Sequence, residues 1–145
     1  MNDITEVQKA YLAGLIDGEG CIHISRRIRN DRKSVDYNPC VVIAQSDREF
    51  LSHWQQIAGV GKLYKIGDAT GFIARRMRWQ WRVTGREAYM LAEVLLPYLV
   101  LKLRQCSLLV EWAGIMSGGL APDDVATQRE RIRLSITEMN QGAAI

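Results

Sequence analysis

Residues 12–20 of this sequence are Leu12-Ala13-Gly14-Leu15-Ile16-Asp17-Gly18-Glu19-Gly20, and they end a predicted helix that begins near residue 4. Residues spaced three and four apart share one stripe of that helix, namely Val7, Ala10, Tyr11, Gly14, Leu15 and Gly18. Gly14 and Gly18 lie one turn apart, and the lack of a side chain at both lets a second helix approach closely. The pattern therefore predicts a helix that packs against another helix along this stripe.

The same stretch ends in two carboxylates, Asp17 and Glu19. Glu19 falls at the C-terminus of the predicted helix, where the helix dipole disfavours an anion, so we expect a compensating cation beside it. Mg²⁺ would suit this position because it binds hard oxygen ligands, often one or two carboxylates with water and substrate phosphate. The residues alone leave open whether the two acids form a metal site or simply a polar helix end.

Beyond Gly20 the hydrophobic period shortens to two residues, which is typical of strands with one buried face. The alternation covers residues 20–29 and then residues 37–44, and the charged segment between them predicts a hairpin with a basic tip. Lys62–Ile66 is predicted to be a third strand and residues 76–83 a fourth. In the fourth strand the apolar face carries Met77, Trp79, Trp81 and Val83.

Capping signals predict helices between and after these strands. The motif Ser46-x-x-Glu49 predicts the start of one helix, which Gly59 ends. The motif Thr84-x-x-Glu87 predicts the start of another, which runs towards Pro97.

Two further helices are predicted over residues 102–116 and 122–139. The order of elements predicts an α+β fold in which helices cover one face of a four-stranded antiparallel sheet and leave the other face open. We expect a single domain over residues 1–145, with a core of about residues 5–117 and a helical extension of about residues 121–140.

Basic residues gather in two parts of the chain, although the formal net charge is only +3. One group is Arg26, Arg27, Arg29, Arg32 and Lys33, and the other is Arg75, Arg76, Arg78, Arg82 and Arg86. Clustered arginine is expected of a surface that binds the phosphates of a nucleic acid. Solvated strand and loop residues would give the same two groups, so charge alone leaves the choice open.

The composition is that of an ordinary globular protein, because 48% of the residues are hydrophobic and 24% are charged. No apolar run reaches the length of a membrane-spanning helix. Cys21, Cys40 and Cys106 are widely spaced and odd in number, which favours reduced thiols over a disulfide framework or a zinc site. We therefore expect an intracellular protein, in a compartment that the sequence does not specify.

Residues 12–20 resemble the signature of the LAGLIDADG homing endonuclease family. They depart from it only within the last three positions, where Gly18-Glu19-Gly20 replaces Ala-Asp-Gly and keeps both the small residue and the acid. The predicted order of elements also resembles the αββαββα half of that family. The resemblance implies that the signature helices of two halves pack together, and that Glu19 holds metal at the scissile phosphates.

The resemblance also implies roles for neighbouring positions. The carbonyl of Gly18 would be a further metal ligand, and Asp17 would orient the contact between the helices. Gln45 would help to order water in the active site, and Lys102 would stabilise developing phosphoryl charge or hold a nucleophilic water. An ordinary strand-end amide at position 45 and a surface lysine at position 102 are the alternatives.

The chain carries one signature, but cutting both strands of DNA requires two acids. The economical solution is a homodimer with twofold symmetry. Its interface would comprise Tyr11, Gly14, Leu15, Asp17 and Gly18. The implied activity is that of a site-specific homing endonuclease, which makes a double-strand break in a long pseudo-palindromic site during intron homing. The implied cofactor is Mg²⁺, with Mn²⁺ or Ca²⁺ able to replace it in binding.

The polar face of the sheet would contact the double-stranded DNA, because side chains at alternate strand positions can reach base edges in the major groove. The candidates are His23, Ser25, Arg27, Arg29, Asn38, Cys40, Tyr64, Arg76, Arg78, Gln80 and Arg82.

Two other functions would keep the same fold. An intron-encoded maturase assists RNA splicing and need not cut DNA, and a regulator of this fold binds DNA without cutting it. Glu19 favours the nuclease over an RNA-binding protein, which has no need of an acid at that position. The residues after 121 are too few for the helix-turn-helix region that a regulator of this kind usually adds.

Overall fold

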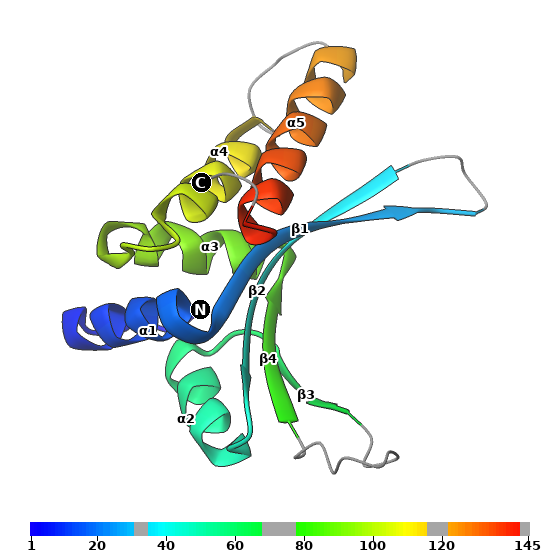
Figure 1. Cartoon of the computed structure of the whole chain (residues 1–145). Helices are drawn as coiled ribbons and strands as arrows, with labels where there is room; N and C mark the ends of the chain where they lie inside the picture. Colours follow the sequence, from blue (N-terminus) through cyan, green and yellow to red (C-terminus); the bar gives the residue numbers. More distant parts are fainter. Residues whose placement is uncertain (31–34, 68–77, 116–121, 143–145) are drawn as a thin grey trace.

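A four-stranded antiparallel sheet with helices against one of its faces forms the framework (Figure 1). The computed structural model describes residues 1–30, 35–67, 78–115 and 122–142. In chain order the elements are α1 (Glu6–Glu19), β1 (Gly20–Ile28), β2 (Val35–Gln45), α2 (Arg48–Ala58), β3 (Lys62–Ile66), β4 (Arg78–Thr84), α3 (Gly85–Leu95), η1 (Leu96–Tyr98), α4 (Leu103–Ile115) and α5 (Pro122–Asn140). The predicted α+β fold, with its αββαββα order and extra C-terminal helices, is confirmed.

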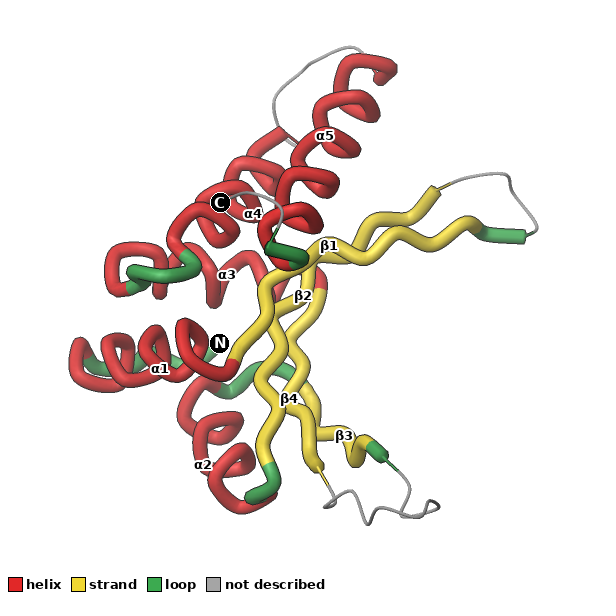
Figure 2. The backbone as a smooth tube through the Cα atoms, in the orientation of Figure 1, coloured by secondary structure: helices red, strands yellow, loops and turns green. Residues whose placement is uncertain are grey.

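The strands lie in the order β1-β2-β4-β3, and every neighbouring pair is antiparallel. Figure 2 shows that the sheet bends between two arms, one formed by β1 and β2 and the other by β3 and β4, which diverge on the side away from the helices. The fourth strand has the predicted parity, because Trp81 and Val83 are buried and Trp79 packs against the core. Met77 lies outside the described residues.

The core lies between the sheet and the helices. Side chains that are almost inaccessible to solvent come from the sheet and from helices α1 to α5, and include Ile22, Val41, Ile43, Trp81, Leu12, Ile16, Leu51, Leu91, Leu109, Ile132 and Ile136. The buried indole N–H of Trp81 is hydrogen-bonded, since Nε1 donates to the Val60 carbonyl at 3.0 Å. The helices cover one face of the sheet, and the other face, where Cys40 and Val42 are also buried, carries no helix in the described part of the chain and is available for another molecule.

The two predicted capping boxes are both corrected by the structure. Helix α2 begins after Asp47, whose carboxylate accepts from the Phe50 N–H at 3.1 Å, so Ser46 is not its N-cap. Thr84 does precede α3, but its side chain makes no capping hydrogen bond. Glu87 instead accepts from the Gly61 N–H at 3.0 Å, which ties α3 to the start of β3.

Helix α5 packs beside α4 and against the helix-side face of β1 (Figure 1). Tyr37 of β2 donates to Glu130 at 2.7 Å, and Asn140 donates to the Ile22 carbonyl at 2.8 Å. These bonds attach the C-terminal helix to the arm formed by β1 and β2. Within the described part of the chain, no helix combines the length and the apolar character that crossing a bilayer requires.

Candidate active site and nucleic-acid interface

The face of the sheet away from the helices, here called the open face, carries polar side chains from all four strands. Cross-strand partners point to the same side of a sheet, so the register defines this face. Its pairs are His23 with Cys40, Ser25 with Asn38, Arg27 with Asp36, Tyr64 with Gln80, and Lys62 with Arg82. The candidates for DNA contact on the described strands therefore share one face, and Arg78 has the same parity on β4. Their contact with DNA stays a prediction.

Three of the candidates differ from the other residues of the open face. Arg29 follows the end of β1 and forms an ion pair with Asp36. Cys40 has the right parity but is buried, and its thiol donates to the Asn38 carbonyl. Arg76 lies outside the described residues.

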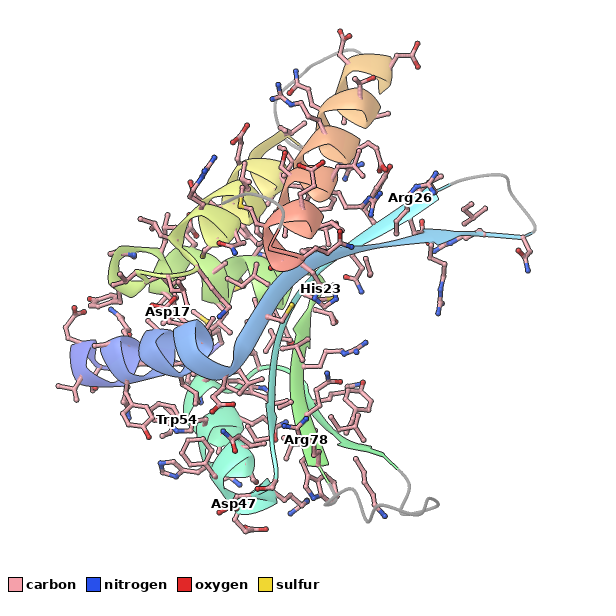
Figure 3. The ribbon with its side chains drawn as sticks, viewed as in Figure 1. Asp17, His23, Arg26, Asp47, Trp54 and Arg78 are labelled. Carbon is pink, nitrogen blue, oxygen red and sulfur yellow. The ribbon has the colours of Figure 1, made fainter. Side chains whose placement is uncertain are left out.

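Positive charge on the open face comes from Arg27, Arg78, Arg82 and Lys62, all of which are exposed. Arg82 donates to the Gln80 side-chain oxygen at 3.3 Å, which orients its guanidinium along the face. Figure 3 shows His23 and Arg78 along this side of the sheet and Asp17 on the side of the helices. Such a row of cations attracts a polyanion and can donate hydrogen bonds to phosphates or to guanine.

A hollow of about 500 Å³ lies on the open face between the β1–β2 arm and β4. It is lined by Ser25, Arg26, Arg27, Asp36, Tyr37, Asn38, Cys40, Arg82 and Thr84. Asp36 adds a carboxylate to an otherwise basic surface, and carboxylates accept hydrogen bonds from the amino group of cytosine. The hollow thus offers donors and an acceptor within one small area.

His23 lies half-buried on the open face, in the edge strand β1. Burial lowers the pKa of its imidazole, and the nearby positive charge of Arg82 lowers this pKa further. Its Nδ1 lies 3.8 Å from the Cys21 thiol. His23 is therefore neutral at pH 7, and a neutral imidazole both donates and accepts a hydrogen bond.

Glu19 is the last residue of α1, and its side chain is exposed. Within the described part of the chain its carboxylate has no hydrogen bond or ion pair, and Gly18 beside it is exposed as well. A carboxylate and a peptide carbonyl are ligands of the kind that a divalent cation prefers, so these two residues fit such an ion. The described residues contain no cluster of three acidic, histidine or cysteine ligands, so further ligands would come from phosphate, water or a second chain.

Asp17 turns the other way from Glu19 and binds the segment that leads into α4. Its two carboxylate oxygens accept from the backbone N–H groups of Val100 and Lys102, each at 2.8 Å. The Lys102 ammonium donates back to the Asp17 carbonyl at 2.6 Å. Burial raises the pKa of Asp17, but these N–H bonds and the Lys102 charge outweigh burial and hold this pKa below its usual range.

The Lys102 ammonium supplies positive charge at the C-terminal turn of α1, where the helix itself has no basic residue. The divalent cation that the sequence predicts beside Glu19 stays a prediction. Gln45 lies in the same region, because β2 pairs Ile43 with Gly20 and Gln45 follows two positions later. The fold thus gathers Glu19, Gln45 and Lys102 at one end of α1.

Comparison with known proteins identifies the family. The sequence-family model of the LAGLIDADG endonuclease matches residues 12–99 of this chain. The chain belongs to the LAGLIDADG endonuclease family. It is a metal-dependent endonuclease that hydrolyses DNA. No match is found among curated protein sequences.

Solved structures of homing endonucleases resemble this endonuclease over most of its length. I-CvuI in complex with its target in the presence of Ca is 26% identical, with a TM-score of 0.70, and the match covers 88% of this chain and 81% of that chain. The archaeal intron-encoded homing endonuclease I-Vdi141I, complexed with DNA, is 20% identical with a TM-score of 0.73, and the match covers 92% of this chain and 84% of that chain.

A third relative, the LAGLIDADG homing endonuclease I-SmaMI bound to cleaved DNA, is 16% identical, with a TM-score of 0.73. The match covers 100% of this chain but only 47% of I-SmaMI, so the I-SmaMI chain is about twice as long.

The outer stripe of α1 in this endonuclease is uncovered within one chain. Leu12, Ala13 and Ile16 face the core, whereas Val7 is 80% exposed and Tyr11 is 53% exposed. Gly14 and Gly18 are also exposed, and no described atom lies within 4 Å of the point where a side chain would begin on either. Tyr11 stacks on Trp54 of α2 with ring centroids 4.8 Å apart, so this end of the stripe packs against α2.

The loop beside this stripe is apolar and exposed too. Val100 is 83% exposed and Leu101 is 72% exposed, and Asp17 holds this loop against α1. Large exposed aliphatic side chains next to an uncovered helix are typical of a protein–protein contact.

The sequence reasoning missed three residues of the open face, Asp36, Lys62 and Thr84. The first two have the same parity as residues that it did select, since Asp36 is two positions from Asn38 and Lys62 two from Tyr64. Strand parity applied to the full length of β2 and β3 would have found them. The contact between Asp17 and Lys102 left no comparable signal, because the two residues are 85 positions apart.

Proposed function

We propose that this LAGLIDADG endonuclease is a homodimeric homing endonuclease that cuts one phosphodiester bond in each strand of a long, nearly palindromic duplex. The observation that carries the proposal is the uncovered stripe of α1, which ends in a carboxylate without a partner in the described part of its own chain. One chain supplies one such acid, and a twofold axis along the stripe would bring a second acid beside it.

The proposed interface comprises Tyr11, Gly14, Leu15, Asp17 and Gly18. Gly14 and Gly18 leave room for the partner helix, and the exposed Val100 and Leu101 would extend the buried apolar area. The Asp17 carboxylate is already bonded to the loop, so its contribution would be to hold Val100 and Leu101 in place. Relatives such as I-SmaMI, about twice as long, support the pairing because one such chain has room for two units.

Glu19 and the Gly18 carbonyl would hold Mg²⁺, and Mn²⁺ or Ca²⁺ could replace it in binding. The bound ion would activate a water molecule and offset charge on the leaving oxygen. Gln45 would orient water through its amide, and the Lys102 ammonium would stabilise negative charge on the phosphoryl oxygens. All of these groups lie at the end of α1, where the twofold axis would pass.

The open faces of two subunits would form a saddle over the major groove. Arg27, Arg78 and Arg82 would contact phosphates or guanine, and His23, Gln80 and Tyr64 would contact base edges. Support comes from the side-chain parity of the four strands and from I-CvuI, solved in complex with its target, and I-Vdi141I, solved with DNA.

We further propose that residues 5–117 form one endonuclease domain, to which residues 121–140 add a helical extension. The function would be exercised inside the cell, in intron homing. Cys21, Cys40 and Cys106 are free thiols, in keeping with a reducing compartment.

The test is selection of cleaved sites from a randomised duplex library in the presence of Mg²⁺, followed by assays of Glu19→Gln on the selected site. We expect the wild type to cut both strands and Glu19→Gln to lose at least a thousandfold in rate while binding DNA within about threefold. Glu111→Gln, an exposed acid of α4, is the control and should cut normally. A wild type that binds DNA tightly but never cuts would contradict the proposal.

A further inference from the structure

Asp17 and Lys102 hold one another at two separate points. The Asp17 carboxylate receives the Lys102 backbone N–H at 2.8 Å, and the Asp17 carbonyl receives the Lys102 ammonium at 2.6 Å. A lysine side chain has several freely rotating bonds, and its charged end normally samples many positions. Here both its base and its end are bound by the same residue, so the ammonium is confined.

The second carboxylate oxygen of Asp17 fixes the direction of the loop. It accepts from the Val100 N–H at 2.8 Å, so the carboxylate bridges Val100 and Lys102 just before α4 begins at Leu103. Asp17 is only partly accessible, and it lies between the exposed stripe of α1 and the buried face of that helix. The carboxylate is therefore fully engaged within its own chain and is not available to a metal ion.

The confined ammonium lies beside the candidate active site. It binds the carbonyl of Asp17, two residues before Glu19, and its charge acts on the thiol of Cys21, two residues after Glu19. A group that stabilises charge in a transition state works best when it is already fixed in position before the reaction.

We propose that Asp17 is a positioning residue, which fixes the Lys102 ammonium at the end of α1 that carries Glu19. The inference rests on the proposed function in one respect, since it takes Lys102 to be the cation that stabilises the reacting phosphate. The proposal also explains why position 17 carries an acid. A carboxylate has two acceptor oxygens, and each of them accepts one of the two backbone N–H groups, those of Val100 and Lys102.

The first test is Asp17→Asn, which keeps the size of the side chain but leaves one acceptor oxygen for two N–H groups. Single-turnover cleavage should fall at least tenfold, whereas the Kd for DNA should change by less than threefold. Glu87→Gln is the matched control, because Glu87 also accepts a backbone N–H from another segment, that of Gly61, away from this site. Glu87→Gln should leave cleavage within twofold of the wild type.

A double-mutant cycle separates positioning from a general structural effect. If Asp17 acts through Lys102, then Asp17→Asn should slow a Lys102→Ala enzyme by less than twofold. A loss of tenfold or more in both backgrounds, or no effect of Lys102→Ala on the wild type, would overturn the proposal.

A readout that does not depend on cleavage is NMR of the lysine ammonium groups. The Lys102 ammonium protons should exchange slowly with water in the wild type and at least tenfold faster in Asp17→Asn. Equal exchange rates would overturn the proposal even if cleavage falls. If the wild type cuts no DNA, the proposed function fails, and these exchange rates still decide whether Asp17 confines Lys102.

A second variant covers the case in which Asp17→Asn does not fold. Val100→Pro removes one N–H donor to Asp17 while both Asp17 and Lys102 remain, and Leu99 already has the extended backbone that precedes proline. This variant should slow cleavage at least threefold and speed the exchange of the Lys102 ammonium. Wild-type behaviour in both assays would overturn the proposal.

Discussion

The Tyr37 hydroxyl donates to the Glu130 carboxylate at 2.7 Å, which joins the second strand to a helix 93 positions later in the chain. Glu130 also binds Arg133 of the same helix at 2.7 Å and lies 3.8 Å from Arg26 of β1. The network attaches α5 to the arm of the sheet that carries Arg27 and Asn38. The position of that part of the open face thus depends on a helix at the other end of the chain.

Stability in acid should therefore depend on Glu130. The hydrogen bond from Arg133 and the bond from Tyr37 outweigh burial and lower the pKa of Glu130 from 4.5 to about 2. Because the folded state holds the carboxylate ionised, the stabilisation is complete above about pH 4.5 and is lost as the pH falls towards 2. Glu130 is partly exposed, so solvent screens its interactions. We therefore expect the ionised carboxylate to add on the order of 1 kcal/mol to the free energy of unfolding.

The measurement is thermal unfolding of the wild type and of Glu130→Gln from pH 7 to pH 2. At pH 7 the variant should be less stable, and the difference should vanish near the acid end. Glu138→Gln, an exposed acid of the same helix, is the control. A difference between wild type and Glu130→Gln that stays constant over this range would refute the assignment.

Gly14→Leu should weaken the proposed dimer while it stabilises the helix. A leucine on the close-packed stripe would force the helices apart and weaken the free energy of dimerisation by about 1–3 kcal/mol, which is about fivefold to 150-fold in Kd. In the monomer the same substitution replaces glycine, a poor helix former, and should raise the free energy of unfolding by about 0.8 kcal/mol.

Sedimentation equilibrium and thermal unfolding at low protein concentration measure the two effects of Gly14→Leu separately. Gly114→Leu is the control, because Gly114 is an exposed glycine within α4 that has equal room among the described residues. It should leave the dimer intact. A wild type that is monomeric at every concentration would exclude the proposed interface.

DNA affinity should fall steeply as salt rises, and Arg78 should contribute to it. Each phosphate contact that is lost reduces the slope of log K against log salt by about 0.9. Arg78→Ala should therefore lower affinity at least threefold in dilute salt. Arg131→Ala removes an exposed arginine from α5, on the helix side, and should have little effect. Equal losses for both variants would show that the open face is not the DNA surface.

His23 should titrate below its ordinary pKa of 6.5, because burial and then the charge of Arg82 disfavour the imidazolium. Its folded state binds fewer protons than the unfolded state, so its contribution to stability is lost as the pH falls below 6.5. In Arg82→Ala the pKa of His23 should rise, since one positive charge has gone.

NMR titration of the His23 ring protons measures this pKa directly. Lys65→Ala removes a cation from β3 whose parity points away from the open face, and it should leave the His23 pKa unchanged. An unchanged pKa in Arg82→Ala would show that burial alone accounts for the shift.

Local patterns were enough to predict most of the elements. The period of two in residues 76–83 predicted which side of β4 carries Trp79, Trp81 and Val83, and the structure agrees where it is described. Such a prediction succeeds because side-chain direction in a strand depends on the residue's own position. The start of α2 was missed by one residue, because Ser46 and Asp47 are both good N-caps and only the geometry of the turn selects between them.

The sequence by itself determined the family, the order of helices and strands, the polar face of the sheet and Glu19 as the candidate metal ligand. All of these follow from residues close together along the chain. The partner of Asp17 was decided by the tertiary structure alone. The packing of α1 against the loop before α4 brings Lys102 across 85 positions to the end of the signature helix, and no local pattern of charge or hydrophobicity encodes such a contact.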